Sequence, residues 1–193
     1  MSPLSALLSD IRACTRCADH LPLGPRPVLQ AQASARILIA AQAPGRKVHA
    51  SGLPFDDASG NELRRWLGVS REQFYDARHI AIVPMGFCYP GRGRSGDLPP
   101  RPECAPAWRA ALLAQLEQVE LRLVIGRHAQ AYHFPAHTQS LTALVADWRA
   151  QWPAMLPLPH PSPRNRLWFK RNPWFESELV PLLQARVAGL LEN

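Results

Sequence analysis

The sequence predicts a layered α/β fold built around a mostly parallel sheet. Four short apolar runs are typical of strands that are buried on both faces. Segments with helix-capping residues lie between most of these runs. Buried strands that alternate with helices predict a parallel sheet whose faces are covered by those helices. The four predicted strands span residues 36–41, 79–83, 121–125 and 155–158.

Capping residues place the helices along the chain. Ser2 followed by Pro3 is a typical helix start. Gly68 is a typical helix stop, and Ser70-x-x-Gln73 matches the capping box of the helix that follows. The predicted helices run from Pro3 to about Cys14, over 61–67, 106–119, 127–133 and 140–152, and from Asn172-Pro173 onward with a bend at Pro181.

Length and composition describe one globular unit. The chain has 193 residues, of which 47% are hydrophobic and 19% charged, so we expect a single domain over residues 1–193. No apolar run approaches the roughly 20 residues that a membrane span needs. The first residues lack the basic start and the long apolar stretch of a secretion signal. We therefore expect a cytoplasmic, monomeric protein with no membrane partner.

The charge balance favours a polyanionic partner. The formal net charge is +7, and most of the positive charge is arginine, because Lys47 and Lys170 are the only lysines. Arginine makes planar, bidentate contacts with phosphate. Basic side chains also gain affinity for nucleic acids by releasing counterions. Many basic proteins bind no nucleic acid, so charge alone leaves this question open.

Four cysteines form the first candidate site. They are Cys14-x-x-Cys17, Cys88 and Cys104, and fifteen residues separate the last two. In a cytoplasmic protein such a set favours metal binding over disulfides. A structural zinc ion usually takes its ligands from two close pairs, and the second pair here is wide. An iron–sulfur cluster accepts thiolates from more scattered loops, and buried cysteines also pack as small apolar groups. Spacing alone leaves a cluster, zinc and no metal open.

Two proline-containing turns form the second candidate site. Residues 41–45, Ala-Gln-Ala-Pro-Gly, follow the first predicted strand, and residues 160–163, His-Pro-Ser-Pro, follow the fourth. Ligands of parallel α/β sheets bind beyond the carboxyl ends of the strands, where both turns are expected. His160 can donate a hydrogen bond to charge that develops on a leaving group, although a histidine beside prolines is commonly structural. The other histidines are expected on the surface or in packing contacts: His20, His49, His79, His128, His133 and His137.

The turn-rich segment 52–60 and a set of basic residues complete the candidates. Phe55 can be a platform on which a base stacks, although an aromatic residue in a loop commonly covers the core. Asp56 and Asp57 are suited either to cap the start of a helix or to activate a water molecule with their carboxylate. Basic residues interleaved with aromatic ones are typical of a nucleic-acid surface, and about equally of a solvated basic face. These residues are Arg92, Arg94, Arg164, Arg166, Lys170 and Arg171, with Trp168 among them.

Taken together, these motifs resemble the uracil-DNA glycosylase superfamily over nearly the whole chain. Gln42-Ala43-Pro44-Gly45 is similar to the first glycosylase motif, a Gly-Glu-Ala-Pro-Gly type turn. Gly52-x-Pro54-Phe55 followed by Ala58-x-Gly60 resembles the uracil-stacking loop of the bacterial iron–sulfur enzymes, family 4. His160-Pro161-Ser162-Pro163-Arg164-Asn165 resembles the second motif, in the form also found in single-strand-selective glycosylases. The cysteines and their fifteen-residue gap fall where family 4 ligates a 4Fe-4S cluster.

The resemblance implies a fold and an activity. The fold is a three-layer α/β/α arrangement with a central, mostly parallel four-stranded sheet. The activity is that of a monofunctional DNA glycosylase, which acts in base excision repair on DNA that contains uracil or another deaminated base. Such an enzyme extrudes the damaged base from the helix before it cleaves the glycosidic bond.

The resemblance also implies roles for individual residues. His160 would hydrogen-bond the uracil O2 as negative charge grows there. Phe55 would stack on the base, while the backbone around Gln42 and Ala43 would contact the base and position water. The DNA contacts would come from Ser162, Pro163, Arg164 and Asn165. A structural 4Fe-4S cluster, with zinc as the alternative, would be held by Cys14, Cys17, Cys88 and Cys104.

The chain departs from the family pattern at several positions. Gln42 stands where family 4 has a glutamate and Ala43 where other families have Asp or Asn, so this turn has no carboxylate to activate water. Asp56 or Asp57 is expected to take over that role. Pro84 replaces the asparagine that recognises uracil in family 4, which leaves the excised base open. Loop 92–103 lacks the histidine with which one branch traps DNA, so we expect no covalent adduct.

Two other functions are compatible with the residues. A non-catalytic protein that binds damaged DNA on the same scaffold would explain Gln42, Ala43 and Pro84. A redox-sensing module would explain the cysteines alone. The enzyme hypothesis differs from both because it predicts base release that His160→Ala abolishes.

Overall fold

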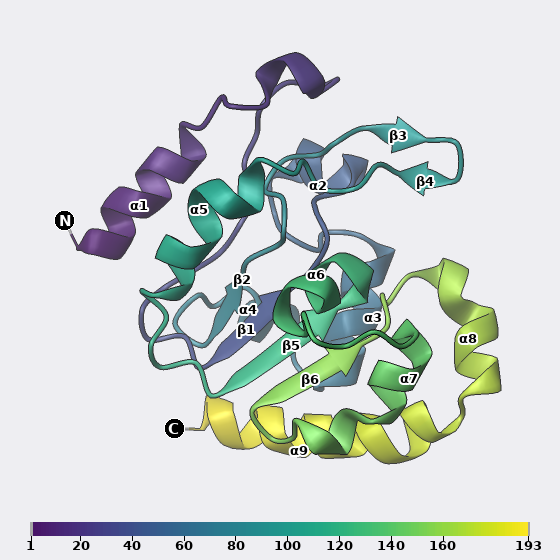
Figure 1. Ribbon diagram of the computed structural model, residues 1–193. Helices are drawn as coiled ribbons and strands as arrows, with labels where there is room; N and C mark the ends of the chain where they lie inside the picture. The colour runs from purple at the N-terminus through teal and green to yellow at the C-terminus, as the bar shows by residue number, and fades with distance from the viewer. Residues whose placement is uncertain (1, 193) are drawn as a thin grey trace.

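A parallel sheet of four strands forms the centre of the molecule (Figure 1). The computed structural model describes residues 2–192, and the strand order is β2-β1-β5-β6. All three neighbouring pairs are parallel. Each predicted strand is confirmed to within one residue at either end. The strands are β1 (Ile37–Ala40), β2 (Ile80–Ile82), β5 (Leu121–Ile125) and β6 (Met155–Leu158).

Alternating side chains of the strands pack against helices on both faces of the sheet. Ile37 and Ile39 belong to a core cluster with residues of α3 (Ala58–Leu67) and α9 (Val180–Leu191). Leu38, which lies between them in the strand, belongs to a second cluster with residues of α1 (Pro3–Arg12) and α5 (Cys104–Leu113). Successive side chains of a strand point to opposite faces, so these helices form separate layers. The predicted three-layer α/β/α arrangement is confirmed.

Shorter elements complete the fold. A small antiparallel hairpin, β3 (Arg92–Gly93) with β4 (Gly96–Asp97), extends from the carboxyl side of the sheet, at the upper right of Figure 1. No helix among residues 2–192 combines the length and the apolar character needed to cross a membrane. The remaining helices are α2 (Arg46–Ser51), α4 (Arg71–Phe74), α6 (Gly126–His133), α7 (Leu141–Ala146) and α8 (Arg166–Arg171). Turns of 3-10 helix span Ala18–His20, Trp148–Ala150 and Pro163–Asn165, and a π-helical turn spans Phe175–Leu179.

Two predicted helix lengths are wrong. The helix predicted over 106–119 ends at Leu113, because the backbone continues through tighter turns that bring Leu116 and Val119 into the core. The helix predicted over 140–152 ends at Ala146 and is followed by a 3-10 turn that buries Trp148. Pro181 lies in the first turn of α9, directly after the π-helical turn Phe175–Leu179, so the final helix is irregular next to this proline.

Candidate active site

A cavity of about 480 Å³ opens at the carboxyl ends of the sheet strands. The segment after each strand contributes to its wall. Ala41 to Gly45 follow β1, Pro84 follows β2, Arg127 follows β5 and His160 follows β6. The two proline turns identified in the sequence therefore meet in one pocket, as expected for ligand sites of parallel α/β sheets.

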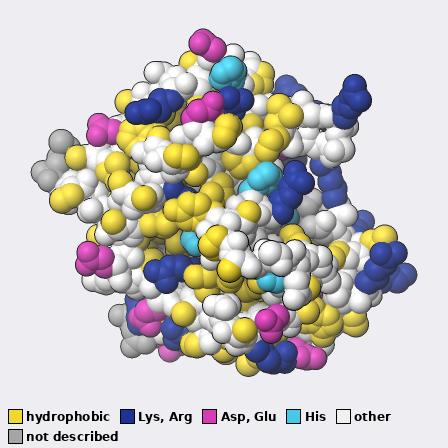
Figure 2. Space-filling model, in the orientation of Figure 1, with side chains coloured by type: hydrophobic (Ala, Val, Ile, Leu, Met, Phe, Trp, Pro, Cys, Tyr) yellow, Lys and Arg dark blue, Asp and Glu magenta, His cyan; other side chains and the backbone are white. Residues whose placement is uncertain are grey.

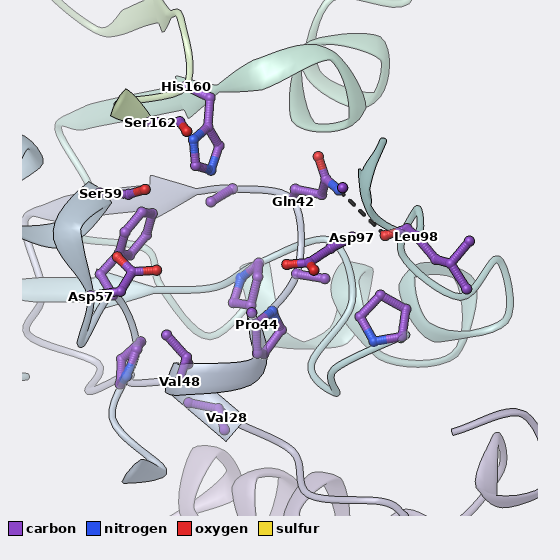
Figure 3. Close-up of a pocket in the computed structure, with 18 of the residues that line it drawn as sticks. Val28, Gln42, Pro44, Val48, Asp57, Ser59, Asp97, Leu98, His160 and Ser162 are labelled. Atoms are coloured by element: carbon purple, nitrogen blue, oxygen red, sulfur yellow. Dashed lines mark hydrogen bonds between the residues drawn. The ribbon is translucent and has the colours of Figure 1, made fainter. Parts of the chain in front are cut away.

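His160 projects its imidazole into this cavity from the segment after β6 (Figure 3). Its backbone carbonyl accepts a 2.7 Å hydrogen bond from the side-chain amide of Asn165, which fixes the turn between them. Burial lowers the pKa of His160, and the carboxylates of Asp57 and Asp97 act in the opposite direction. A neutral imidazole that donates one N–H is therefore the form that this pocket favours near neutral pH.

The turn at 42–45 lies across the cavity from His160 (Figure 3). Pro44 is buried, and Gly45 begins α2 as its N-cap. The Gln42 side-chain amide donates a hydrogen bond of 3.5 Å to the backbone carbonyl of Leu98. Ala43 lines the cavity without a polar side chain. This turn thus offers backbone groups and an amide that is engaged with the hairpin.

Phe55 lines the cavity in an unusual backbone conformation. Its φ angle is 57°, which L residues with bulky side chains rarely adopt. Gly60 makes this conformation possible, because a Cβ at position 60 would lie 1.7 Å from the Phe55 carbonyl oxygen. The Tyr75 hydroxyl also donates a 3.0 Å hydrogen bond to the Pro54 carbonyl. A strained residue that several neighbours hold in place is a common sign of a functional position.

The two aspartates of this loop have different surroundings. Asp57 lines the cavity, and its Oδ1 accepts a 2.9 Å hydrogen bond from the Gly60 backbone N–H as the N-cap of α3. Asp56 lies outside the set of cavity-lining residues and pairs with Arg71 at 3.0 Å. The hydrogen bond from Arg71 lowers the pKa of Asp56. Of the two candidates for activating water, Asp57 is the one that faces the cavity.

The β3–β4 hairpin supplies a cavity wall that the sequence did not predict. Ser95, Gly96, Asp97 and Leu98 all line the cavity. Arg164 Nη1 donates a 3.4 Å hydrogen bond to the Ser95 carbonyl, so the hairpin touches the His160 segment. Two-residue strands have no apolar alternation from which they can be predicted. Asp97 was therefore missed as a site residue.

A buried arginine supports the wall after β2. Arg109 is 1% exposed, and its Nη1 donates to the carbonyl oxygens of Val83 (2.9 Å) and Pro84 (3.2 Å). Its Nη2 contacts His133 Nε2 at 2.8 Å. Burial lowers the pKa of Arg109 to about 10 and that of His133 to about 4, so the imidazole accepts from the guanidinium. Pro84 lines the cavity, and Arg109 thereby fixes one of its walls.

Basic residues surround the opening of the cavity. Arg127 and Arg164 line it, and Arg92 and Arg94 are exposed on the hairpin. In Figure 2 the surface is hollowed between the hairpin and α8, and dark blue side chains stand on both sides of the hollow. The exposed basic residues of α8 are Arg166, Lys170 and Arg171. This rim carries the charge expected for contacts with phosphates.

The four cysteines line a second, smaller cavity. They come from the segment after α1, the loop after β2 and the start of α5. Burial raises the pKa of Cys17, Cys88 and Cys104, that of Cys104 to about 11. The Phe87 backbone N–H donates a 3.4 Å hydrogen bond to Cys104 Sγ. Within residues 2–192, no three His, Cys, Asp or Glu side chains are arranged to hold a single metal ion.

Three of the four residues predicted to contact DNA line the cavity. Ser162 and Asn165 line the cavity together with Arg164, whereas Pro163 is exposed and does not line it. The Ser162 hydroxyl accepts a 3.2 Å hydrogen bond from the Arg164 backbone N–H and begins a 3-10 turn. The His160 segment is thus an ordered turn beside the cavity, with Pro163 and Arg164 at its outer surface.

A comparison with known families bears on the site as a whole. The family model described as the Uracil DNA glycosylase superfamily matches residues 29–184. The matched region contains the 42–45 turn, the Phe55 loop, the hairpin and the His160 segment. It begins after Cys14 and Cys17.

Proposed function

Because the chain belongs to the uracil-DNA glycosylase superfamily, we propose that it is a monofunctional DNA glycosylase of base excision repair. The reaction is hydrolysis of the N-glycosidic bond between deoxyribose and uracil or another deaminated base. The observation that carries this proposal is the His160 imidazole, which faces the Gln42–Gly45 turn across a cavity of about 480 Å³. The basic rim of that cavity suits DNA as the partner.

His160 acts on the leaving base. When the glycosidic bond of deoxyuridine breaks, its electron pair stays with the uracil, which becomes an anion with charge on O2. A neutral imidazole that donates an N–H to that oxygen stabilises the charge as it develops. The lowered pKa of His160 and the bond from Asn165 to its backbone carbonyl support this role.

Phe55 and the first turn bind the flipped base. The Phe55 ring offers a stacking surface, in a loop whose backbone has a positive φ angle and packs closely against Gly60. The small Ala43 side chain leaves room for the base beside the backbone of the turn. Pro84 lies on the wall that Arg109 supports, and its side chain has no donor or acceptor that could hydrogen-bond a base. The site therefore suits more than one deaminated base.

The His160 segment also contacts the DNA. Ser162 and Pro163 contact the backbone next to the flipped nucleotide, and Arg164 contacts a phosphate or the opened stack. Asn165 holds the turn that presents them. The exposure of Pro163 and Arg164 beside the cavity supports these assignments.

Water must be positioned and deprotonated for hydrolysis. Gln42 positions it through its backbone, while its side-chain amide ties the turn to Leu98. Two carboxylates line the cavity and are candidates to accept the proton: Asp57, which the sequence already offered, and Asp97 of the hairpin. An activating carboxylate typically contributes a rate factor of about 100 or more.

A 4Fe-4S cluster held by Cys14, Cys17, Cys88 and Cys104 is part of the proposal. Its support is that four thiols from three separate segments line one cavity. A zinc ion needs its ligands around a single centre, and no such set is found among the described residues. The thiolates of a cluster bind separate irons, so they can stand farther apart. The cluster would join the N-terminal segment to the loop after β2 and to α5.

A glycosylase assay tests the proposed function. Single- and double-stranded oligonucleotides that contain uracil, hypoxanthine or xanthine are incubated with the protein and then treated with alkali. We expect alkali-labile abasic sites with at least one base and none with undamaged DNA. Tight, salt-sensitive binding without base release would instead show a non-catalytic lesion-binding protein. Neither binding nor release would contradict both functions.

A further inference from the structure

The Asp97 carboxylate has no partner of its own. It lies on β4, lines the cavity and makes no hydrogen bond or ion pair with any residue in the described range 2–192. In Figure 3 the carboxylates of Asp57 and Asp97 point toward each other below the His160 imidazole. Both carboxylates line the same cavity as His160, and each raises the pKa of its imidazole.

Two contacts hold Asp97 in this position. The Ser95 carbonyl, two residues before it, accepts a hydrogen bond from Arg164, and the Leu98 carbonyl, directly after it, accepts one from Gln42. The hairpin is therefore attached to both glycosylase motifs, on either side of Asp97. Gly96 lets the hairpin approach closely, because its φ is +146° and a Cβ there would lie 2.7 Å from Arg164 Nη1.

Asp97 stands against the turn that lacks a carboxylate of its own. Its Oδ2 would lie 3.3 Å from a Cβ on Gly45, next to the motif positions occupied by Gln42 and Ala43. A residue from a different part of the chain thus brings negative charge to this turn. The Gln42 amide thus has a structural role, because its hydrogen bond attaches the hairpin to this turn.

We propose that Asp97, rather than Asp57, is the carboxylate that accepts the proton of the attacking water. This inference rests on the proposed glycosylase function. The sugar of a flipped nucleotide stays attached to the DNA backbone and therefore lies at the cavity rim. Asp97 is exposed at that rim beside the DNA-contacting Arg164, whereas Asp57 is partly buried and its Oδ1 caps α3.

The step balances as a hydrolysis. The bond between the sugar C1′ and the base nitrogen breaks, and its electron pair leaves with the base, whose O2 accepts a hydrogen bond from His160. The water oxygen bonds to C1′ and one of its protons passes to the Asp97 carboxylate. Asp97 then releases this proton to solvent or to the departed base. The products are the free base and an abasic site.

Single-turnover excision by paired variants tests this assignment. The excision rates of Asp97→Asn and Asp57→Asn are compared with the rate of wild type. Asp10→Asn, at an exposed position on α1, is the control for loss of a negative charge. The substrate contains the damaged base that wild type releases fastest. Asparagine is itself a good N-cap, so Asp57→Asn removes the charge and keeps the cap of α3. Affinity for the same oligonucleotide is measured at constant salt for every variant.

We expect Asp97→Asn to lower the excision rate by about 100-fold or more, with affinity unchanged or tighter because a negative charge beside the phosphates is lost. Asp57→Asn and Asp10→Asn should stay within about threefold of wild type. Three results would overturn the assignment: a wild-type rate for Asp97→Asn, a large loss for Asp57→Asn alone, or equal losses of rate and affinity for Asp97→Asn. Wild-type protein that releases no base would contradict the proposed function itself.

Discussion

The side-chain amide of Asn165 donates a 2.7 Å hydrogen bond to the backbone carbonyl of His160. These residues lie at the two ends of the motif that resembles the second glycosylase motif. The bond closes the turn and fixes the direction in which the imidazole enters the cavity. The DNA contact expected of Asn165 stays a prediction, while the structure shows that its amide is bonded to the His160 backbone.

Asn165→Ala should lower the rate of base excision without abolishing it. Loss of the bond lets the His160 segment move, and small displacements of a hydrogen-bond donor weaken transition-state stabilisation strongly. We expect a loss of about 10- to 100-fold in kcat, and a smaller effect on DNA affinity. Asn165→Gln, whose longer amide cannot repeat the geometry, should behave similarly. A loss in affinity alone would show that Asn165 acts only as a DNA contact.

The pKa of His160 should lie below the ordinary histidine value of about 6.5. Burial lowers it, and Asp57 and Asp97 each raise it. Asp57→Asn and Asp97→Asn should therefore each lower the pKa further. An NMR titration of the histidine ring protons in wild type and both variants measures this directly. An unchanged pKa in Asp97→Asn would contradict the placement of this carboxylate near the ring.

The depressed pKa of His160 also affects stability. Protonation of His160 is less favourable in the folded protein than in the unfolded chain. Its contribution to stability is thus present above about pH 6.5 and is lost as the pH falls toward the pKa of the folded state. His133 acts in the same direction, since burial and Arg109 lower its pKa to about 4.

Gly60→Ala should destabilise the fold and distort the Phe55 loop. The new Cβ would lie 1.7 Å from the Phe55 carbonyl oxygen, so backbone must move. We expect a loss of about 3 kcal/mol or more in the free energy of unfolding, which lowers Tm by about 10 °C for a chain of this size. Ala58→Ser, at an exposed position of the same helix, should change Tm by less than about 2 °C. Equal Tm values for the two variants would contradict the close packing of the loop.

Removal of one cysteine should remove the proposed cluster. Anaerobically purified wild-type protein should be brown, with broad absorbance in the blue and about four irons per chain. Cys88→Ser should lose this colour and most of the iron, and its Tm should fall because three segments are no longer joined. Colourless wild-type protein with one zinc per chain would contradict the iron–sulfur assignment.

The sheet and the two proline-containing turns could be predicted because their signals are local. Apolar runs mark the four strands, and the rule that ligands bind at the carboxyl ends of parallel strands places residues 42–45 and His160 together. The capping box at Ser70 and Gln73 is also confirmed. Such features depend on neighbouring residues in the chain.

The rest of the site depends on contacts between distant parts of the chain. The hairpin reaches the cavity through Gln42 and Leu98, which are 56 positions apart, and through Ser95 and Arg164, which are 69 apart. No local pattern distinguishes Asp97 from an ordinary surface aspartate. In the sequence, Arg109 cannot be distinguished from any other arginine of an amphipathic helix. Only the structure shows that it donates a hydrogen bond to the Pro84 carbonyl.

The central claim is that His160 assists cleavage of the glycosidic bond. The most direct measurement is the single-turnover release of free base, quantified by chromatography, for wild type and His160→Ala on the damaged base that wild type prefers. Loss of one hydrogen bond to a developing oxyanion predicts a rate decrease of about 100-fold or more, with DNA affinity nearly unchanged. Equal rates of base release by the two proteins would contradict the account.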